Sequence, residues 1–148
     1  MFNKNKTMAI NTVTTKWKRD MLLVSDNPSG QHLFIDAGPE NGGNSEGYRP
    51  KALMLSALAG CSGLDVASLF KKMKIDVDDF EIIVDAELTE EHPKFYHKVH
   101  VNYHFYGTDL NEKKIAKAIK LSVDKYCGVM EMFRQFCELT TENHYHNN

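Results

Sequence analysis

The sequence lacks the features that mark a membrane, secreted or nucleic-acid-binding protein. No stretch approaches the roughly 20 apolar residues of a membrane span, and residues 1–17 contain no apolar core of a secretory signal. The formal charge of -2 at pH 7 gives no global cationic field, so nucleic acid is a poor candidate partner. Three cysteines without an export signal do not form a disulfide framework. We therefore expect a cytoplasmic protein in which any disulfide is transient.

Common catalytic and binding motifs are also missing. The glycine-rich stretch 38–47 has neither GxGxxG nor a GK[ST] ending and predicts a loop, and neither HExxH nor a Ser-His-Asp order occurs. Among the seven histidines, His100 and His104 lie about 13 Å apart on an expected strand. His144 and His146 share a face of the tail and would bind a metal only weakly. We expect no metal or cofactor, which leaves the thiols as the good nucleophile candidates.

The pattern of apolar residues predicts one α+β domain over residues 1–148. Strands are expected over 10–17, 21–25, 31–37, 80–89, 95–106 and 138–145, and helices over 50–74, over 129–136 and after a cap at Asp109 or Asn111. Alternation along the fifth strand places Phe95 on the same face as Val99, Val101, Tyr103 and Phe105.

The helix over 50–74 is unusually long and apolar. It would measure about 35 Å, more than a small domain easily surrounds, so we expect a second subunit to cover part of it. Gly60 and Gly63 each cost a helix interior about 1 kcal/mol relative to alanine. Either close packing of another helix or room for a substrate beside Cys61 would offset that cost.

The three cysteines lie in different settings. Cys61 lies between the two glycines, with Asp65 one turn later, and an unpaired carboxylate there would disfavour the thiolate. Cys127 precedes Gly128 where one helix stops and another begins, a position at which a helix N-terminus can stabilise a thiolate. Cys137, which we place at the end of the last helix, is interpreted as a packing residue.

Two motifs resemble the OsmC/Ohr family of small bacterial thiol proteins, closest to its OsmC-like branch. The segment PKALMLSALAGCSGLD over 50–65 resembles the family's proline-led helix with the first cysteine. Residues 114–127, which end in Lys-Tyr-Cys, resemble the segment with the second. The resemblance implies an intertwined homodimer in which the long helices pack centrally between β-sheets, with paired cysteines at each side of the interface.

The resemblance also implies a chemistry. The first cysteine, Cys61, would attack an organic hydroperoxide and become a sulfenic acid, and Cys127 would condense with it to a disulfide that an external dithiol reduces. An arginine from the N-terminal strands would hold the thiolate, and Arg19 is the candidate, with Arg49 in reserve. The glutamate that peroxidase members carry after the helix-opening proline is replaced by Lys51 and Ala52.

We therefore predict a thiol-dependent peroxidase, and two alternatives remain open at the level of sequence. A non-enzymatic dimer could bind an apolar molecule in the same cleft, with the cysteines merely lining it. A redox sensor could instead pass its disulfide to a partner protein. Cys61, Cys127 and Arg19 are the predicted catalytic residues of the peroxidase.

Overall fold

The computed structural model describes residues 8–148, which form two compact units with the boundary between Ala52 and Leu53. The first unit is a three-stranded antiparallel meander of β1 (Thr15–Arg19), β2 (Leu22–Asp26) and β3 (His32–Ile35), followed by the 3-10 turn η1 (Pro39–Asn41). The prediction of a strand from residue 10 was wrong. The β1–β2 pairing stops at Thr15 opposite Ser25, since the partners of earlier residues fall in the turn after Asp26.

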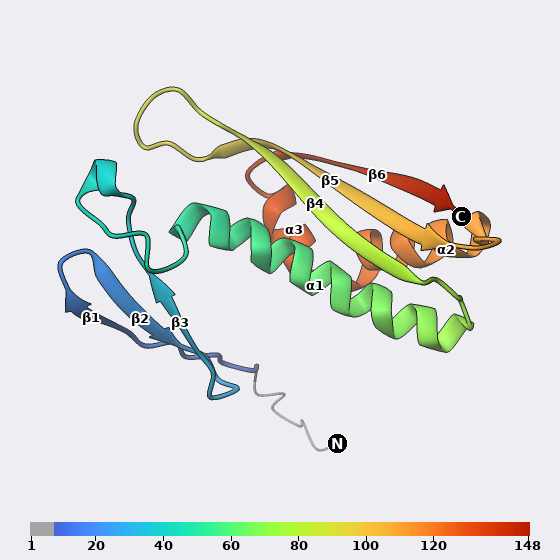
Figure 1. The fold of residues 1–148 in the computed structure, drawn as a ribbon, viewed down its shortest axis with the longest axis horizontal. Coiled ribbons are helices and arrows are strands. Elements are labelled where there is room, and N and C mark those ends of the chain that lie inside the picture. The colour runs from blue at the N-terminus through green and yellow to red at the C-terminus, as the bar shows by residue number, and fades with distance from the viewer. Residues whose placement is uncertain (1–7) are drawn as a thin grey trace, which may run out of the picture. The chain divides into compact units, whose positions relative to one another are not determined.

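The second unit packs helices against one sheet. Helix α1 (Pro50–Met73), which starts at the end of the first unit, leads to β4 (Asp79–Leu88) and β5 (Tyr96–Gly107). Helix α2 (Glu112–Leu121), a π-helical turn η2 (Ser122–Tyr126) and helix α3 (Gly128–Arg134) precede β6 (Glu138–Asn147). The sheet order is β4-β5-β6, antiparallel and then parallel. Figure 1 shows α1 and α2 along one face of this sheet, which confirms the α+β class.

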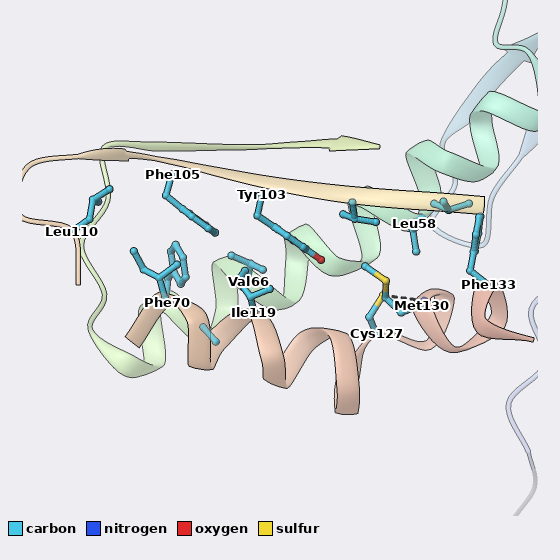
Figure 2. Packing of buried hydrophobic residues seen from close by; sticks show 14 of the residues in the cluster. Leu58, Val66, Phe70, Tyr103, Phe105, Leu110, Ile119, Cys127, Met130 and Phe133 are labelled. Atoms are coloured by element: carbon cyan, nitrogen blue, oxygen red, sulfur yellow. Dashed lines mark hydrogen bonds between the residues drawn. The ribbon is translucent and has the colours of Figure 1, made fainter. Parts of the chain in front are cut away.

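The core of the second unit lies between the sheet and the helices. Buried side chains come from α1, β5, α2 and α3 and pack in one cluster (Figure 2): Leu58, Val66, Phe70, Val99, Val101, Tyr103, Phe105, Ile115, Ala118, Ile119, Met130 and Phe133. Asn111 caps α2, and its side chain accepts a hydrogen bond from the Lys114 N–H, as one of the two predicted caps.

One register prediction on β5 was wrong. A bulge between Glu87 and Leu88 shifts the pairing, so Tyr96 rather than Phe95 enters the core. Tyr96 is 9% exposed and Phe95 is 50% exposed. The alternation from Val99 onward holds as predicted, because pairing beyond the bulge is regular.

Helix α1 is long and apolar enough to cross a membrane by length and composition alone, contrary to our expectation that no stretch approaches this limit. One face of the helix is nevertheless buried in the core of the second unit, at Leu58, Ser62, Val66 and Phe70. The opposite face stays open, and Leu64 there is 77% exposed. Helix α1 therefore packs as the core helix of a folded unit on one side and presents an apolar surface on the other.

Candidate functional site

Cys61 and Cys127 are brought together in the second unit. Cys61 lies on α1, is half-buried, and packs against the core cluster to which Cys127 belongs. Cys127 is 5% exposed, and its thiol interacts with the thiol of Cys61. Both side chains are free thiols. Two cysteines that are 66 residues apart in the sequence (127 minus 61) thus form one site, with the more exposed cysteine on α1.

The π-helical turn η2 and the start of α3 position Cys127. Its N–H donates a hydrogen bond to the Ser122 carbonyl, with N and O 2.8 Å apart, and Cys127 itself is the N-cap of α3. Its Sγ accepts a hydrogen bond from the Met130 N–H at 3.4 Å. The predicted placement at a helix start is therefore confirmed. A π turn adds one residue to the helical path, which aims the following residue differently from a regular helix.

Burial, however, dominates the titration of Cys127. Removal from water, together with the neighbouring Cys61 thiol, raises the pKa of Cys127 to about 11, and the hydrogen bond from Met130 opposes this rise only in part. At neutral pH Cys127 is therefore a protonated thiol. The helix start alone does not make it a ready nucleophile, contrary to what its position in the sequence suggested.

A chain of hydrogen-bonded hydroxyls lies beside the two cysteines. Ser62 Oγ is 2.6 Å from the hydroxyl of Tyr103 and 2.9 Å from Ser122 Oγ, and Ser122 donates to Asp65 Oδ2 at 3.1 Å. Ser62, Tyr103 and Ser122 are completely buried. Asp65 is paired, because its carboxylate accepts the hydrogen bond from Ser122. Burial raises the pKa of Tyr103 to about 12, so its hydroxyl keeps its proton.

Sequence reasoning missed this chain, although a signal for part of it was present. Ser62 lies at the spacing of Leu58 and Val66 on the buried face of α1, and Ser122 follows Ala118 and Ile119 of α2 at helical spacing. A serine at such a position predicts a buried hydroxyl that needs a partner. The identity of that partner depends on which strand and helix face each other.

Arg19 lies on β1 in the first unit and is paired with carboxylates there. Its Nη2 is 2.6 Å from Glu46 Oε2, and its Nη1 is 3.7 Å from Asp20 Oδ2. The side chain is 51% exposed. The first turn of α1 holds no acidic residue, as Lys51 and Ala52 predicted. Glu46, four residues before Pro50, is the carboxylate that orients Arg19 in this chain.

Arg49, the reserve candidate, is committed to the loop before α1. Its Nη1 donates to the carbonyls of Asp36 and Gly47 at 3.1 and 3.3 Å, and its Nη2 donates to Ser45 Oγ at 2.9 Å. The buried Asp36 carboxylate accepts from the N–H groups of Glu46, Asn44 and Ala37, which lower its pKa. Arg49 and Asp36 therefore fix the loop that carries Glu46.

Cys137 is not in the last helix, where we had placed it, because α3 ends at Arg134. The residue lies in the bend before β6, and its Sγ donates to the Phe133 carbonyl at 3.1 Å. It is half-buried against the core cluster, and burial raises its pKa. These contacts are those of a packing residue.

The parallel pairing of β6 with β5 brings together histidines that are distant in the sequence. His104 pairs with His144 across the two strands, and its Nδ1 is 2.9 Å from His146 Nε2. His100 hydrogen bonds to Thr140 at 2.6 Å. Within residues 8–148, no group of three histidine, cysteine, aspartate or glutamate side chains is arranged to hold a metal ion.

Comparison with known proteins identifies the family. Residues 42–142, which include both Cys61 and Cys127, match the family of OsmC-like proteins, so this chain belongs to that family. Protein YhfA of Escherichia coli strain K12 is 33% identical over 127 residues, which cover 84% of this chain and 90% of that protein. The resemblance that the two cysteine motifs indicated is thereby confirmed.

Solved structures share the fold. A hypothetical protein from Aquifex aeolicus VF5 superposes with a TM-score of 0.76 at 26% identity, over 93% of this chain and 98% of that chain. An organic hydroperoxide resistance protein OsmC from Legionella pneumophila gives a TM-score of 0.68 at 16% identity, over 94% and 99% of the two chains. The α+β architecture built around a long central helix is therefore that of OsmC-like structures.

Proposed function

We propose that this protein is a thiol-dependent peroxidase that reduces organic hydroperoxides. The observation that carries the proposal is the pairing of a half-buried thiol, Cys61, with a buried thiol, Cys127, in one site. Membership in the OsmC-like family and the similarity to a structure named as an organic hydroperoxide resistance protein support the same chemistry. The electrons come from thiols, so the cycle requires no cofactor.

In the first step the Cys61 thiolate attacks the terminal oxygen of the hydroperoxide. A sulfur–oxygen bond forms, the oxygen–oxygen bond breaks, and the alcohol leaves after taking up one proton. Cys61 is oxidised to the sulfenic acid and the hydroperoxide is reduced. Cys61 is the more exposed of the two cysteines and can therefore contact the substrate, whereas burial of Cys127 keeps that thiol from reacting first.

In the second step the Cys127 sulfur attacks the Cys61 sulfenic sulfur. The disulfide forms and the sulfenic oxygen leaves as water, together with the proton of Cys127. An external dithiol then reduces the disulfide by exchange and is itself oxidised. This step needs thiols that are kept reduced, and we therefore place the protein in the cytoplasm.

We assign Arg19 as the cation that stabilises the Cys61 thiolate. Its guanidinium is half-exposed and is oriented by Glu46, whereas the donors of Arg49 are used by the loop. Exchanging Arg19 for methionine should slow Cys61 oxidation more than Glu46→Gln does, because the second change removes only the orienting carboxylate. An Arg49→Met rate loss as large as that of Arg19→Met, with the fold retained by circular dichroism, would transfer the role to Arg49.

We also propose that the protein acts as a homodimer in which the open face of α1 is covered by the second subunit. Leu64 and Met54 on this helix are 77% and 45% exposed in a single chain. A methyl group added at Gly60 would meet nothing within 4 Å in its own chain, so the packing of one subunit does not account for this glycine. Large apolar side chains that a single chain leaves exposed on a long helix are typical of an interface.

The peroxidase proposal is tested by hydroperoxide consumption with excess dithiothreitol as reductant. Cumene hydroperoxide should be consumed continuously by the wild type and by Cys137→Ser, the matched control at the packing cysteine. Without dithiothreitol, Cys127→Ser should consume about one equivalent and stop at the Cys61 sulfenic acid, and Cys61→Ser should consume none with or without the reductant. Steady turnover by Cys61→Ser at the wild-type rate would refute the assignment.

A further inference from the structure

The hydroxyl chain beside the cysteines has only one arrangement of donors. A carboxylate accepts hydrogen bonds, so the single proton of Ser122 points to Asp65. Ser122 must then accept from Ser62, and Ser62 from Tyr103, because each hydroxyl has one proton to donate. All three donors therefore run in the same direction, from the buried ring of β5 to the carboxylate on α1.

Burying three hydroxyl groups in a core costs free energy, because each is removed from water. A hydroxyl taken from water without a partner costs about 1–3 kcal/mol, and apolar side chains would fill the same space with no such demand. The chain is nevertheless fully satisfied: none of the buried side-chain nitrogen or oxygen atoms within residues 8–148 lacks a hydrogen-bond partner. A satisfied buried network fixes the elements that carry it in one relative position.

The elements fixed in this way are those that carry the cysteines. Ser62 directly follows Cys61 on α1, and the Ser122 carbonyl accepts the hydrogen bond of the Cys127 N–H. The Ser62–Ser122 contact thus connects the backbone at one cysteine to the backbone at the other. Tyr103 holds the same contact from the side of the sheet, and Figure 2 shows its ring extending from β5 toward the helices.

The outer end of the chain is anchored at the surface. Asp65 lines an open cavity of about 340 Å³ with Ser68, Leu69, Lys72 and Tyr126. The carboxylate therefore meets water on one side and Ser122 on the other. Because a buried hydroxyl chain needs a terminal acceptor, Asp65 fixes the direction of the donors without being buried itself.

We propose that Ser62, Ser122 and Tyr103 are positioning residues for closure of the Cys61–Cys127 disulfide, an inference that rests on the proposed two-cysteine function. A disulfide requires sulfur atoms about 2.05 Å apart with a restricted dihedral angle, so small shifts of either segment oppose its formation. The hydroxyl chain holds α1 and η2 in register and raises the effective concentration of one thiol at the other. The three hydroxyls are assigned no part in forming or breaking bonds at either sulfur; they position the two backbone segments that carry the cysteines.

The test is the equilibrium between the dithiol and the disulfide in glutathione redox buffers, read by alkylation and intact mass. This equilibrium requires no hydroperoxide. Ser122→Ala, which removes two hydrogen bonds of the chain, should lower the effective concentration of the thiols about tenfold, and Tyr103→Phe, which removes one, about threefold. All variants carry Cys137→Ser, so that the measured disulfide joins only Cys61 and Cys127.

Ile119→Val is the matched control. It trims a neighbouring buried side chain of α2 and destabilises the core to a similar extent, but leaves every hydroxyl in place. Its effective concentration should equal that of the Cys137→Ser parent. An unchanged value in Ser122→Ala, or an equal loss in Ile119→Val, would overturn the positioning role. A wild-type protein that forms no Cys61–Cys127 disulfide in any buffer would overturn the two-cysteine function itself, and the inference with it.

Discussion

Closure of the disulfide onto oxidised Cys61 should accelerate steeply as pH rises. The attacking group is the thiolate of Cys127, whose pKa of about 11 is set first by burial and then by the adjacent Cys61 thiol. Conversion of Cys61 to the sulfenic acid removes the second influence but not the first, because Cys127 stays inside the core. The reactive form of Cys127 is therefore a small fraction at neutral pH.

The expected magnitude follows from that pKa. A thiol of pKa about 11 is ionised in roughly one molecule in ten thousand at pH 7 and in about one in a hundred at pH 9. The rate of disulfide formation should thus rise about 100-fold over these two pH units. The sulfenic acid should be long-lived at pH 7 compared with the same intermediate at pH 9.

Quenched-flow sampling measures this step directly. Reduced Cys137→Ser protein is mixed with one equivalent of cumene hydroperoxide, and the sulfenic acid is trapped with dimedone at successive times at pH 7, 8 and 9. The trapped fraction should decay about tenfold faster for each pH unit. A decay rate that is constant from pH 7 to 9 would show that Cys127 is not held as a buried protonated thiol, and would refute the reasoning.

Three further predictions concern assembly and stability. Leu64→Glu should convert the dimer to a 16.9 kDa monomer in light scattering, whereas the control Ile83→Glu, at an exposed apolar position on β4, should leave it dimeric. A dimeric Leu64→Glu protein would contradict an interface at α1. Phe105→Ala should lower the free energy of unfolding in urea by about 3–5 kcal/mol and Phe95→Ala by under about 1 kcal/mol, and equal losses would contradict the bulge on β5. The unfolding free energy should fall as pH rises from 9 toward 11, because the Cys127 thiol ionises in the unfolded chain while it keeps its proton in the folded one. The fall should be shallower in Cys127→Ala, and identical slopes in the two proteins would exclude this contribution.

Local sequence signals predicted most of the fold. Pro50 marked the first turn of α1, and Asn111 capped α2, because such positions depend on the backbone groups of a few neighbouring residues. The start of β1 was missed because it depends on where its partner turns away after Asp26. The change from Phe95 to Tyr96 as the core residue likewise depends on the bulge at His97 of β5, which appears only when β5 pairs with β4.

The candidate site divides in the same way. The motifs around Cys61 and Cys127 indicated a shared site, because each carries a recognisable local pattern. The partners of Ser62 could not be predicted, since Tyr103 and Ser122 reach it only when β5, α1 and η2 pack together. The raised pKa of Cys127 could not be predicted from the sequence either, because burial raises it more than the hydrogen bond at the helix start lowers it.

The central claim is that Cys61 and Cys127 perform one oxidative cycle together. The most direct test is the intact mass of fully reduced protein after about one equivalent of cumene hydroperoxide, followed by peptide mapping of linked cysteines. We expect a loss of two hydrogens per chain, with the peptides of Cys61 and Cys127 joined and Cys137 still free. Unmodified thiols, or a link that involves Cys137 instead, would contradict the account.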